Sequence, residues 1–465
     1  MVKKLLLFVF LSAFCFPAMS QHEADKWFFG TLAGLDFSSG SPVVISSNLS
    51  AAEGCATISN SAGKLLFYTE GLSVYDSTHT VMPNGSGIMG DVSSSQTALI
   101  VPSPVGNSQY YLFTTDADGG PDGFRYSIVD MNLGTHGDVL TTAKNVMVVD
   151  DSVCEKIAAV KASSGNGYWI VIHKWGNDEF LAYHLTTAGL LPPVVSHAGS
   201  VHSTSTFQNT YGQMKFNNCG TKLALAMGYQ NTAELFDFDQ STGTVSNPVT
   251  FPFGDHVYGV EFSKSSNLLY ISSYDNTGTI CQYDITLSTP ALIVASRVGL
   301  SATDYLYGMQ MGPDGKIYVA RSFSSSFLGV INSPEKIGFS ANYTDTGIDL
   351  DPGFMGVNPG LSLPGFMQTY LAIATGTSCP STAGIDENTA GNLISVYPNP
   401  SSEGFIVNLS EMKSDVQIFD YSGKCVESHS AVNEVFNFGK TYAKGVYFIR
   451  IISEKGTQVS KIIKL

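Results

Sequence analysis

A pattern of short alternating strands recurs along the first three quarters of this 465-residue chain. Each copy contains an alternating strand, a turn rich in Gly or Asn, an aromatic-rich strand and a third strand. Six copies begin near residues 54, 96, 156, 212, 259 and 308. Their spacing of about 42 to 60 residues is close to that of propeller blades. Because alternation with period two puts one strand face inside and the other outside, each copy predicts a half-buried antiparallel sheet.

Stacking around an axis is the natural way for such sheets to bury their faces, so the repeat predicts a β-propeller. Two apolar segments are left over, at residues 27–37 and 366–373. We expect residues 27–37 to pair with a strand carrying residues 367–373, which would close the ring. Seven blades are therefore expected, with six as the alternative. No stretch shows a sustained period of 3.6 residues, so the fold class is all-β.

The first 20 residues have the pattern of a signal peptide. Lys3 and Lys4 precede an apolar run at residues 5–16, and Ala18-Met19-Ser20 is a small-x-small cleavage site. The run is shorter than the ~20 residues that a membrane helix needs, and no other run approaches that length. The sequence predicts export of a mature chain without a transmembrane segment, beginning with a propeller over residues 21–373.

Composition changes to small and polar residues in a predicted linker at residues 374–391. Residues 392–465 then contain six or seven short alternating strands, which predict a small antiparallel β-sandwich. Four motifs follow one another in this tail: Tyr397-Pro398-Asn399-Pro400, Asp420-Tyr421-Ser422-Gly423-Lys424, Gly445-Val446-Tyr447-Phe448 and Lys461-Ile462-Ile463-Lys464.

The order and spacing of these motifs resemble the type A C-terminal sorting domain of the type IX secretion system. The resemblance implies transport across the inner membrane and then across the outer membrane by the type IX translocon. It further implies removal of the tail by a sortase-like peptidase, followed by release or attachment to surface lipopolysaccharide. The expected location is therefore extracellular or on the outer-membrane surface.

The body, from about residue 26 to 373, resembles a secreted propeller family of the Bacteroidetes. The similar stretches are residues 27–37, 53–56, 66–76, 96–104, 125–133, 154–161 and 360–372. These stretches are typical of structural elements, and the resemblance implies no defined chemistry.

An acidic loop is the strongest candidate for a metal site. Asp116, Asp118 and Asp122 stand at positions 1, 3 and 7 around glycines, an arrangement that can surround Ca²⁺. Ser127 stands where an EF-hand has its bidentate Glu, so an exposed Asp/Gly turn is the alternative.

Two glutamates, Glu53 and Glu155, precede the first-strand segments of two blades. Because first strands line a propeller's centre, both could be channel carboxylates of the kind a glycosidase needs. The alternative is hydrogen bonding between blades. The loop that carries His197 and His202 is expected to face solvent.

The chain has a net charge of −15 and a pI of about 4.9, which disfavours a nucleic-acid partner. No catalytic motif is recognisable. The leading hypothesis is a non-enzymatic module that binds a glycan or a protein. The alternatives are an extracellular hydrolase or lyase acting on polysaccharide or peptide, and a structural part of an adhesion or gliding apparatus.

Overall fold

A computed structural model describes residues 22–371 and 396–465. Short internal stretches are not described, at residues 107, 151, 204–206, 275–277, 301–304, 354–355, 410–412, 421–423, 433–434 and 454–455. The predicted signal peptide and linker lie outside the described residues. The chain divides into two compact units, residues 1–379 and 380–465.

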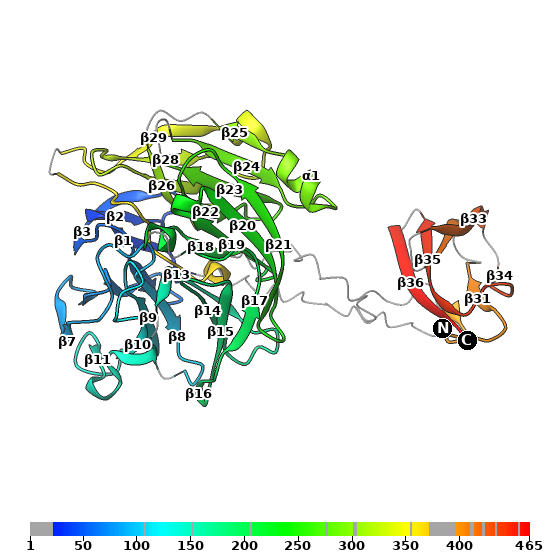
Figure 1. The fold of residues 1–465 in the computed structure, drawn as a ribbon, viewed down its shortest axis with the longest axis horizontal. Coiled ribbons are helices and arrows are strands. Elements are labelled where there is room, and N and C mark those ends of the chain that lie inside the picture. Colours follow the sequence, from blue (N-terminus) through cyan, green and yellow to red (C-terminus); the bar gives the residue numbers. More distant parts are fainter. Residues whose placement is uncertain are drawn as a thin grey trace, which may run out of the picture. The chain divides into compact units, whose positions relative to one another are not determined.

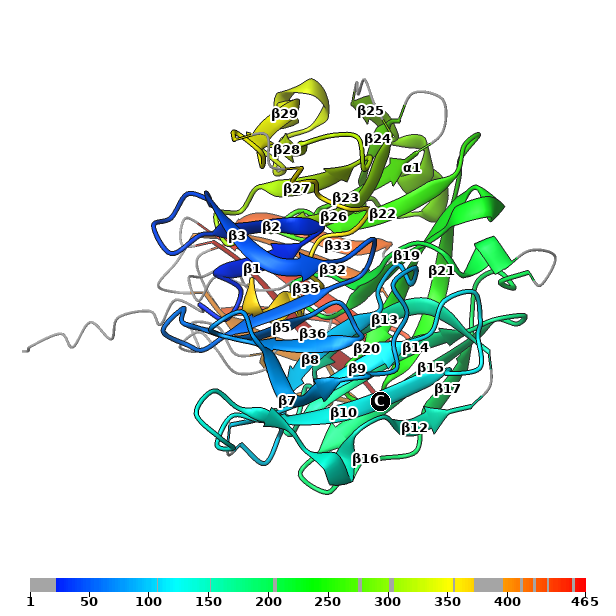
Figure 2. The ribbon, with the colours of Figure 1, turned by 90° about the vertical axis from the view of Figure 1, so that its left-hand side faces the viewer.

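The described part of the first unit holds seven antiparallel sheets, which follow one another around a ring in chain order (Figures 1 and 2). This confirms the predicted all-β propeller with seven blades. The first blade consists of β1 (Lys26–Phe29), β2 (Thr31–Asp36) and β3 (Val43–Ser50). The second consists of β4 (Ala56–Ser59), β5 (Leu65–Thr69), β6 (Ser73–Asp76) and β7 (Val81–Ser86). The third consists of β8 (Ala98–Pro102), β9 (Gln109–Thr115), β10 (Phe124–Asp130), β11 (Asp138–Val139) and β12 (Val146–Val149).

The fourth blade consists of β13 (Val153–Lys161), β14 (Tyr168–Lys174), β15 (Glu179–Thr186), β16 (Gly189–Leu190) and β17 (Val194–His197). The fifth consists of β18 (Met214–Phe216), β19 (Lys222–Met227), β20 (Thr232–Asp239) and β21 (Thr244–Pro252). The sixth blade consists of β22 (Val257–Phe262), β23 (Leu268–Ser273), β24 (Ile280–Asp284) and β25 (Val298–Leu300). The seventh consists of β26 (Leu306–Met311), β27 (Ile317–Arg321), β28 (Phe327–Ile331) and β29 (Tyr343–Asp349).

Helices are short in the described residues of this unit. The α-helix α1 (Pro290–Ala295) begins with Pro290 at a position where a missing N–H costs nothing, and the Thr289 side chain caps it. The 3₁₀ turns are η1 (Thr141–Ala143), η2 (Phe207–Thr210), η3 (Gly228–Gln230), η4 (Gly338–Ala341) and η5 (Gln368–Tyr370).

Large side chains between neighbouring sheets hold the ring together. Phe180 of the fourth blade meets Phe236 of the fifth edge-on, with ring centroids 4.9 Å apart. Phe251 of the fifth blade packs on Tyr283 of the sixth at 4.5 Å. Burying each such side chain contributes roughly 1.5–3 kcal/mol. The alternation seen in the sequence therefore matches blades that are buried on both faces near the axis.

The ring closes differently from the expectation. Residues 27–37 do not pair with a terminal strand; they form β1 and β2, which pair with β3 in a complete three-stranded blade. In the described part of residues 367–373, Gln368–Tyr370 is a 3₁₀ turn. A hairpin partner was available locally, at residues 43–50, and alternation alone does not reveal which strand a segment pairs with.

The two ends of the ring nevertheless meet. Thr31 forms an isolated antiparallel bridge with Asn358. Gly30 beside it has a φ of +54°, and a Cβ there would lie 2.1 Å from the Asn358 carbonyl oxygen. Only glycine fits such a close backbone approach.

Trp27 is the packing centre of this closure. Its ring lies 4.9 Å from Phe37, 5.5 Å from Tyr318 of the seventh blade and 5.9 Å from Phe366, measured between centroids. The side chain is fully buried, and Nε1 donates to the Ala24 carbonyl. One residue thus joins the first blade, the last blade and the end of the propeller.

The second unit is a two-sheet sandwich, as predicted. One sheet has β30 (Val396–Tyr397), β31 (Phe405–Asn408) and β34 (Val435–Phe438), and the other has β32 (Ser414–Asp420), β33 (Cys425–Val432), β35 (Gly445–Ser453) and β36 (Gly456–Lys464). Its core contains Phe405, Val416, Ile418, Ile449 and Ile462.

Replacing Trp27 tests the closure. Trp27→Ala should lower the free energy of unfolding by about 3–5 kcal/mol, because it leaves a cavity shared by three parts of the ring. Denaturant unfolding of the mature protein measures this. Phe339→Ala, at a side chain that is 77% exposed, is the control and should change stability by less than about 0.5 kcal/mol. An unchanged midpoint for Trp27→Ala would contradict the closure described here.

Candidate functional site

The last stretch of the propeller, residues 358–371, passes through the middle of the ring; we call it the central segment. It hydrogen-bonds to the inner ends of four blades, through the pairs Leu361 N–Ala52 O, Gly365 N–Cys55 O, Gly308 N–Leu361 O, Ser362 Oγ–Ser95 O and Gln368 Nε2–Glu261 Oε1. A cavity of about 10 Å³ is left beside it, between the third, fourth and fifth blades. That volume holds about one water at most. The central segment thus occupies the middle of the ring, and this cavity beside it is too small for a ligand.

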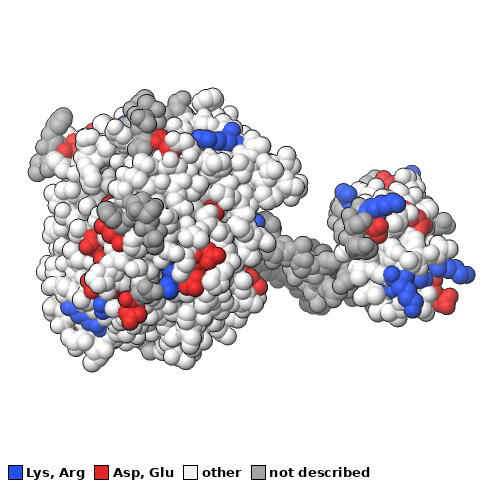
Figure 3. Space-filling model, in the orientation of Figure 1, with Lys and Arg blue, Asp and Glu red and all other residues white. Residues whose placement is uncertain are grey.

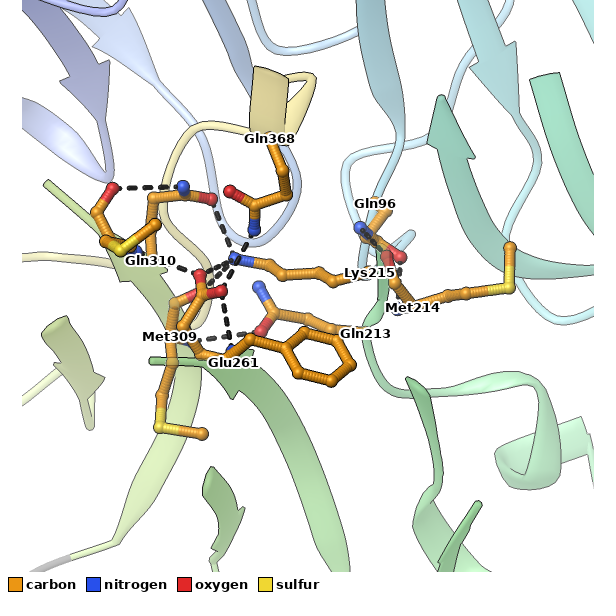
Figure 4. Close-up of polar contacts among 10 residues, drawn as sticks. Gln96, Gln213, Met214, Lys215, Glu261, Met309, Gln310 and Gln368 are labelled. Carbon is orange, nitrogen blue, oxygen red and sulfur yellow. Dashed lines mark hydrogen bonds and ion pairs between the residues drawn. The ribbon is translucent and has the colours of Figure 1, made fainter. Parts of the chain in front are cut away.

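A buried lysine ties the central segment to three blades (Figure 4). Lys215 Nζ on β18 donates to Glu261 Oε2 at 2.8 Å, to Gln310 Oε1 at 2.7 Å and to the Met309 carbonyl. Glu261 also accepts from the Met311 N–H. Burial lowers the pKa of Lys215, and the Glu261 carboxylate opposes that shift. The pair is thus a cross-link among the fifth, sixth and seventh blades and the central segment.

Breaking this buried pair should be costly. Lys215→Met should destabilise the protein by about 3–5 kcal/mol, because Glu261 would be left as a buried charge without its cation. The double variant Lys215→Met/Glu261→Gln should recover part of that loss. Lys222→Met, which removes a surface ion pair with Asp237, is the matched control and should cost about 0–1 kcal/mol. Equal effects of the two single variants in denaturant unfolding would contradict the assigned role.

Glu53 and Glu155, the sequence-predicted channel carboxylates, lie close to one another in a buried network. Glu53 Oε2 accepts from the Tyr258 hydroxyl at 2.6 Å. Glu155 accepts four hydrogen bonds, from Ser95 N and Oγ, Asp118 N and Thr210 Oγ1. These are contacts between blades, the alternative raised by the sequence. A role for the two carboxylates in binding or catalysis remains a prediction.

Burial raises the pKa of Glu53 to about 8, and the nearby Glu155 charge adds to the shift. Burial also raises the pKa of Glu155. Tyr258 donates to Glu53 and so opposes the upward shift. Near neutral pH the Glu53 carboxyl is therefore held mainly in its protonated form.

The raised pKa of Glu53 predicts a pH-dependent stability. The unfolded carboxyl releases its proton near pH 4.5 and the folded one near pH 8, so the folded protein binds more protons between these values. The free energy of unfolding should fall as pH rises from 5 to 8, by an amount on the order of a few kcal/mol. Glu53→Gln should flatten this slope in denaturant unfolding, whereas the exposed Glu335→Gln should leave it unchanged. A Glu53→Gln slope equal to that of the wild type would be inconsistent with the assignment.

Two aspartates of the acidic loop make contacts within the turn. Asp116 accepts from the N–H groups of Ala117 and Asp122, both at 2.8 Å. The Asp122 side chain forms an ion pair with Arg125, and Asp118 has a positive φ of 55°. Each contact stabilises the turn itself. A Ca²⁺ site formed by Asp116, Asp118 and Asp122 stays a prediction.

The sequence reasoning missed the position of His202. The side chain is fully buried rather than solvent-facing, and it lies beside Cys154 and His173. These residues are far apart in the sequence and follow no metal-binding spacing. Only the folding of the fourth blade brings them together, so no local signal could have identified them.

A groove of about 650 Å³ lies beside the first blade. Its lining combines apolar side chains with polar ones, namely Phe28, Leu32, Val44, Ile45, Leu65, Leu350 and Val357 with Lys26, Asp36, Ser46, Ser77 and His79. Lys26 and Asp36 form an ion pair, and the Tyr68 hydroxyl lies 3.0 Å from His79 Nδ1. The polar members are thus fixed in place at an apolar surface.

Leu32 is presented to this groove by unusual backbone geometry. The pairing of β2 with β3 shifts register between Thr31 and Ala33, and Leu32 has a φ of +58°. A positive φ is uncommon for leucine, and such bulges re-aim side chains at functional sites. The Leu32 side chain is also 39% exposed. Leu32 thus combines an unusual backbone conformation with an exposed apolar side chain at the groove.

In the second unit, the first and last sorting motifs meet. The Ile463 N–H donates to Asn399 Oδ1 at 2.9 Å, and Ser401 forms a parallel bridge with Lys464. Lys464 Nζ donates to the carbonyls of Ser402 and Glu403. Tyr397, Pro398 and Pro400 belong to the same stretch, and the peptide bonds before both prolines are cis. Gly445 and Lys461 lie on β35 and β36, and Gly423 lies outside the described residues.

Residues 395–465 match the family model of the secretion system C-terminal sorting domain. The C-terminal unit is a type IX secretion sorting signal. It implies export of the chain to the cell surface or into the medium. None of the helices among the described residues is long and apolar enough to cross a bilayer.

Several solved structures are similar to this chain. One is PorZ, described as an essential surface component of the type IX secretion system of Porphyromonas gingivalis. The two sequences are 12% identical, the match covers 95% of this chain and 74% of PorZ, and the TM-score is 0.34. A protein from Lactobacillus plantarum is 12% identical, with 73% of this chain and 98% of that chain covered and a TM-score of 0.44. The Swd1 β-propeller domain of Myceliophteria thermophila has 10% identity, coverage of 64% and 94%, and a TM-score of 0.41. No curated protein matches the chain significantly.

Proposed function

We propose that this chain is an exported, non-enzymatic binding module whose groove beside the first blade holds a glycan or a protein segment. The bulge that presents Leu32 to the groove is the observation that carries the proposal. Apolar side chains such as Phe28 and Ile45 offer surface for the non-polar faces of a ligand, and Ser46, Ser77 and His79 offer hydrogen bonds. Binding sites commonly combine these two kinds of lining.

The charged lining of the groove does not favour a charged ligand, because Lys26 and Asp36 pair with each other. On the face of the first unit drawn in Figure 3, Asp and Glu side chains form several small groups, with Lys and Arg beside some of them. The hydrolase or lyase alternative needs carboxylates that can reach a substrate. Because Glu53 and Glu155 are buried and hydrogen-bonded between blades, their contacts favour binding over catalysis.

The binding proposal is tested with the mature protein on a glycan array and in pull-downs from outer-envelope fractions. Leu32→Glu should weaken binding about tenfold or more, which corresponds to about 1.4 kcal/mol. Val195→Glu, at a 49% exposed residue on β17, is the matched control and should bind normally. Absence of any bound glycan or envelope protein, or equal binding by both variants, would refute the groove. Stable co-purification of a gliding or adhesion complex would favour the structural alternative.

The export route is tested by removing the tail. A chain without residues 385–465 should fold as a propeller, because each unit has its own core, and should accumulate in the periplasm. Protease accessibility on intact cells, followed by fractionation, measures the location. If the truncated chain still reached the cell surface, another signal would have to direct it.

A further inference from the structure

Three potential metal ligands converge inside the fourth blade. Cys154 lies on β13, His173 on β14, and His202 in the loop after β17. Cys154 Sγ is 3.1 Å from His202 Nδ1. The two imidazole rings are stacked, with centroids 3.7 Å apart. One possible ligand atom from each of the three residues lies within 4.8 Å of the other two.

Neighbouring backbone groups fix this cluster in position. His173 Nδ1 lies 2.6 Å from the Lys174 carbonyl, to which it donates. Metal-binding histidines commonly make such a bond with the nitrogen that does not ligate. The His202 loop is held to the turn after β14 by the pairs His202 N–Asn177 O and Gly176 N–His202 O. All three side chains are at most 1% exposed.

The protein leaves one group of this cluster unsatisfied. His202 Nε2 is buried without a hydrogen-bond partner. A buried polar atom without a partner costs about 1–3 kcal/mol, and native proteins contain few of them. The Cys154 thiol and His173 Nδ1 both contact the Lys174 carbonyl, so the unsatisfied atom is specific to His202. This unpartnered nitrogen independently points to a ligand.

Donor type and number narrow the choice of ion. One sulfur and two imidazole nitrogens select a soft or borderline transition metal such as Cu⁺ or Zn²⁺. A structural zinc site takes four protein ligands, whereas this described cluster has three. The three-ligand set therefore favours Cu⁺ over a structural Zn²⁺.

We propose that Cys154, His173 and His202 bind one monovalent copper ion. On binding, the Cys154 S–H bond breaks, a Cu–S bond forms and the proton leaves to solvent; copper enters and stays as Cu⁺, so no electron is transferred. The site is on the fourth blade and its residues differ from those of the groove. Its success or failure is therefore independent of the binding function proposed above.

The test uses the purified mature protein without oxygen. Cu⁺ is titrated in competition with a chromogenic Cu⁺ chelator, and thermal unfolding is followed with Cu⁺, with redox-inert Ag⁺ and with Zn²⁺. One equivalent of Cu⁺ should bind, and both Cu⁺ and Ag⁺ should raise the midpoint of unfolding because they bind the native state. Failure to bind one Cu⁺, or tighter binding of Zn²⁺, would overturn the proposal.

Matched variants locate the ion. Cys154→Ser and His202→Gln should each weaken Cu⁺ binding about 100-fold or more, beyond the ~10- to 100-fold effect of losing an outer-shell partner. His197→Gln, at an exposed histidine in the same region, and Cys281→Ser, at a buried cysteine of the sixth blade, should bind normally. If a variant fails to fold, X-ray absorption of copper bound to the wild type decides: sulfur and imidazole scatterers are expected, and a copper without sulfur would refute the site.

Discussion

The inner strands of the blades impose the constraint on which the propeller depends. Each inner strand has one edge without a neighbouring strand, and buried N–H and C=O groups at that edge need partners. Side chains from other blades provide them: Gln96 accepts from Met214 N, Gln213 from Met309 N, and Glu261 from Met311 N. The central segment provides others, so one polar lattice satisfies the edges and joins the blades.

This lattice explains why charged groups lie at the axis of an otherwise apolar fold. Lys215 and Glu261 neutralise each other there, while Glu53 is accommodated by holding its proton. A purely apolar centre would leave the edge amides without acceptors. Polar residues near the axis thus have a structural task, and in this ring they do not by themselves mark an active site. The groove at the first blade lies away from this lattice and is lined by both polar and apolar side chains.

Much of the fold follows from local patterns, and most of the candidate sites do not. Alternation and turn residues predicted the blades and the sandwich. Both kinds of pattern depend only on residues that are a few positions apart in the sequence. The partner of residues 27–37 was predicted wrongly, since alternation does not encode pairing. Glu53 and Glu155 were placed near the axis because they accompany inner strands. The groove residue Leu32 depends on a bulge, and His202 depends on three segments meeting, so neither has a signal in the linear sequence.

Because the central segment lies at the end of the first unit, its position in the sequence also affects when the propeller can finish folding. It is the last described part of the propeller to emerge from any machine that moves the polypeptide from its N-terminus onwards. Until it arrives, the inner edges lack several of their partners and Trp27 lacks its contact with Phe366. The ring can reach its full stability only when nearly all of the first unit has emerged. Completion of the propeller thus depends on its last described residues, which the predicted linker separates from the sorting domain.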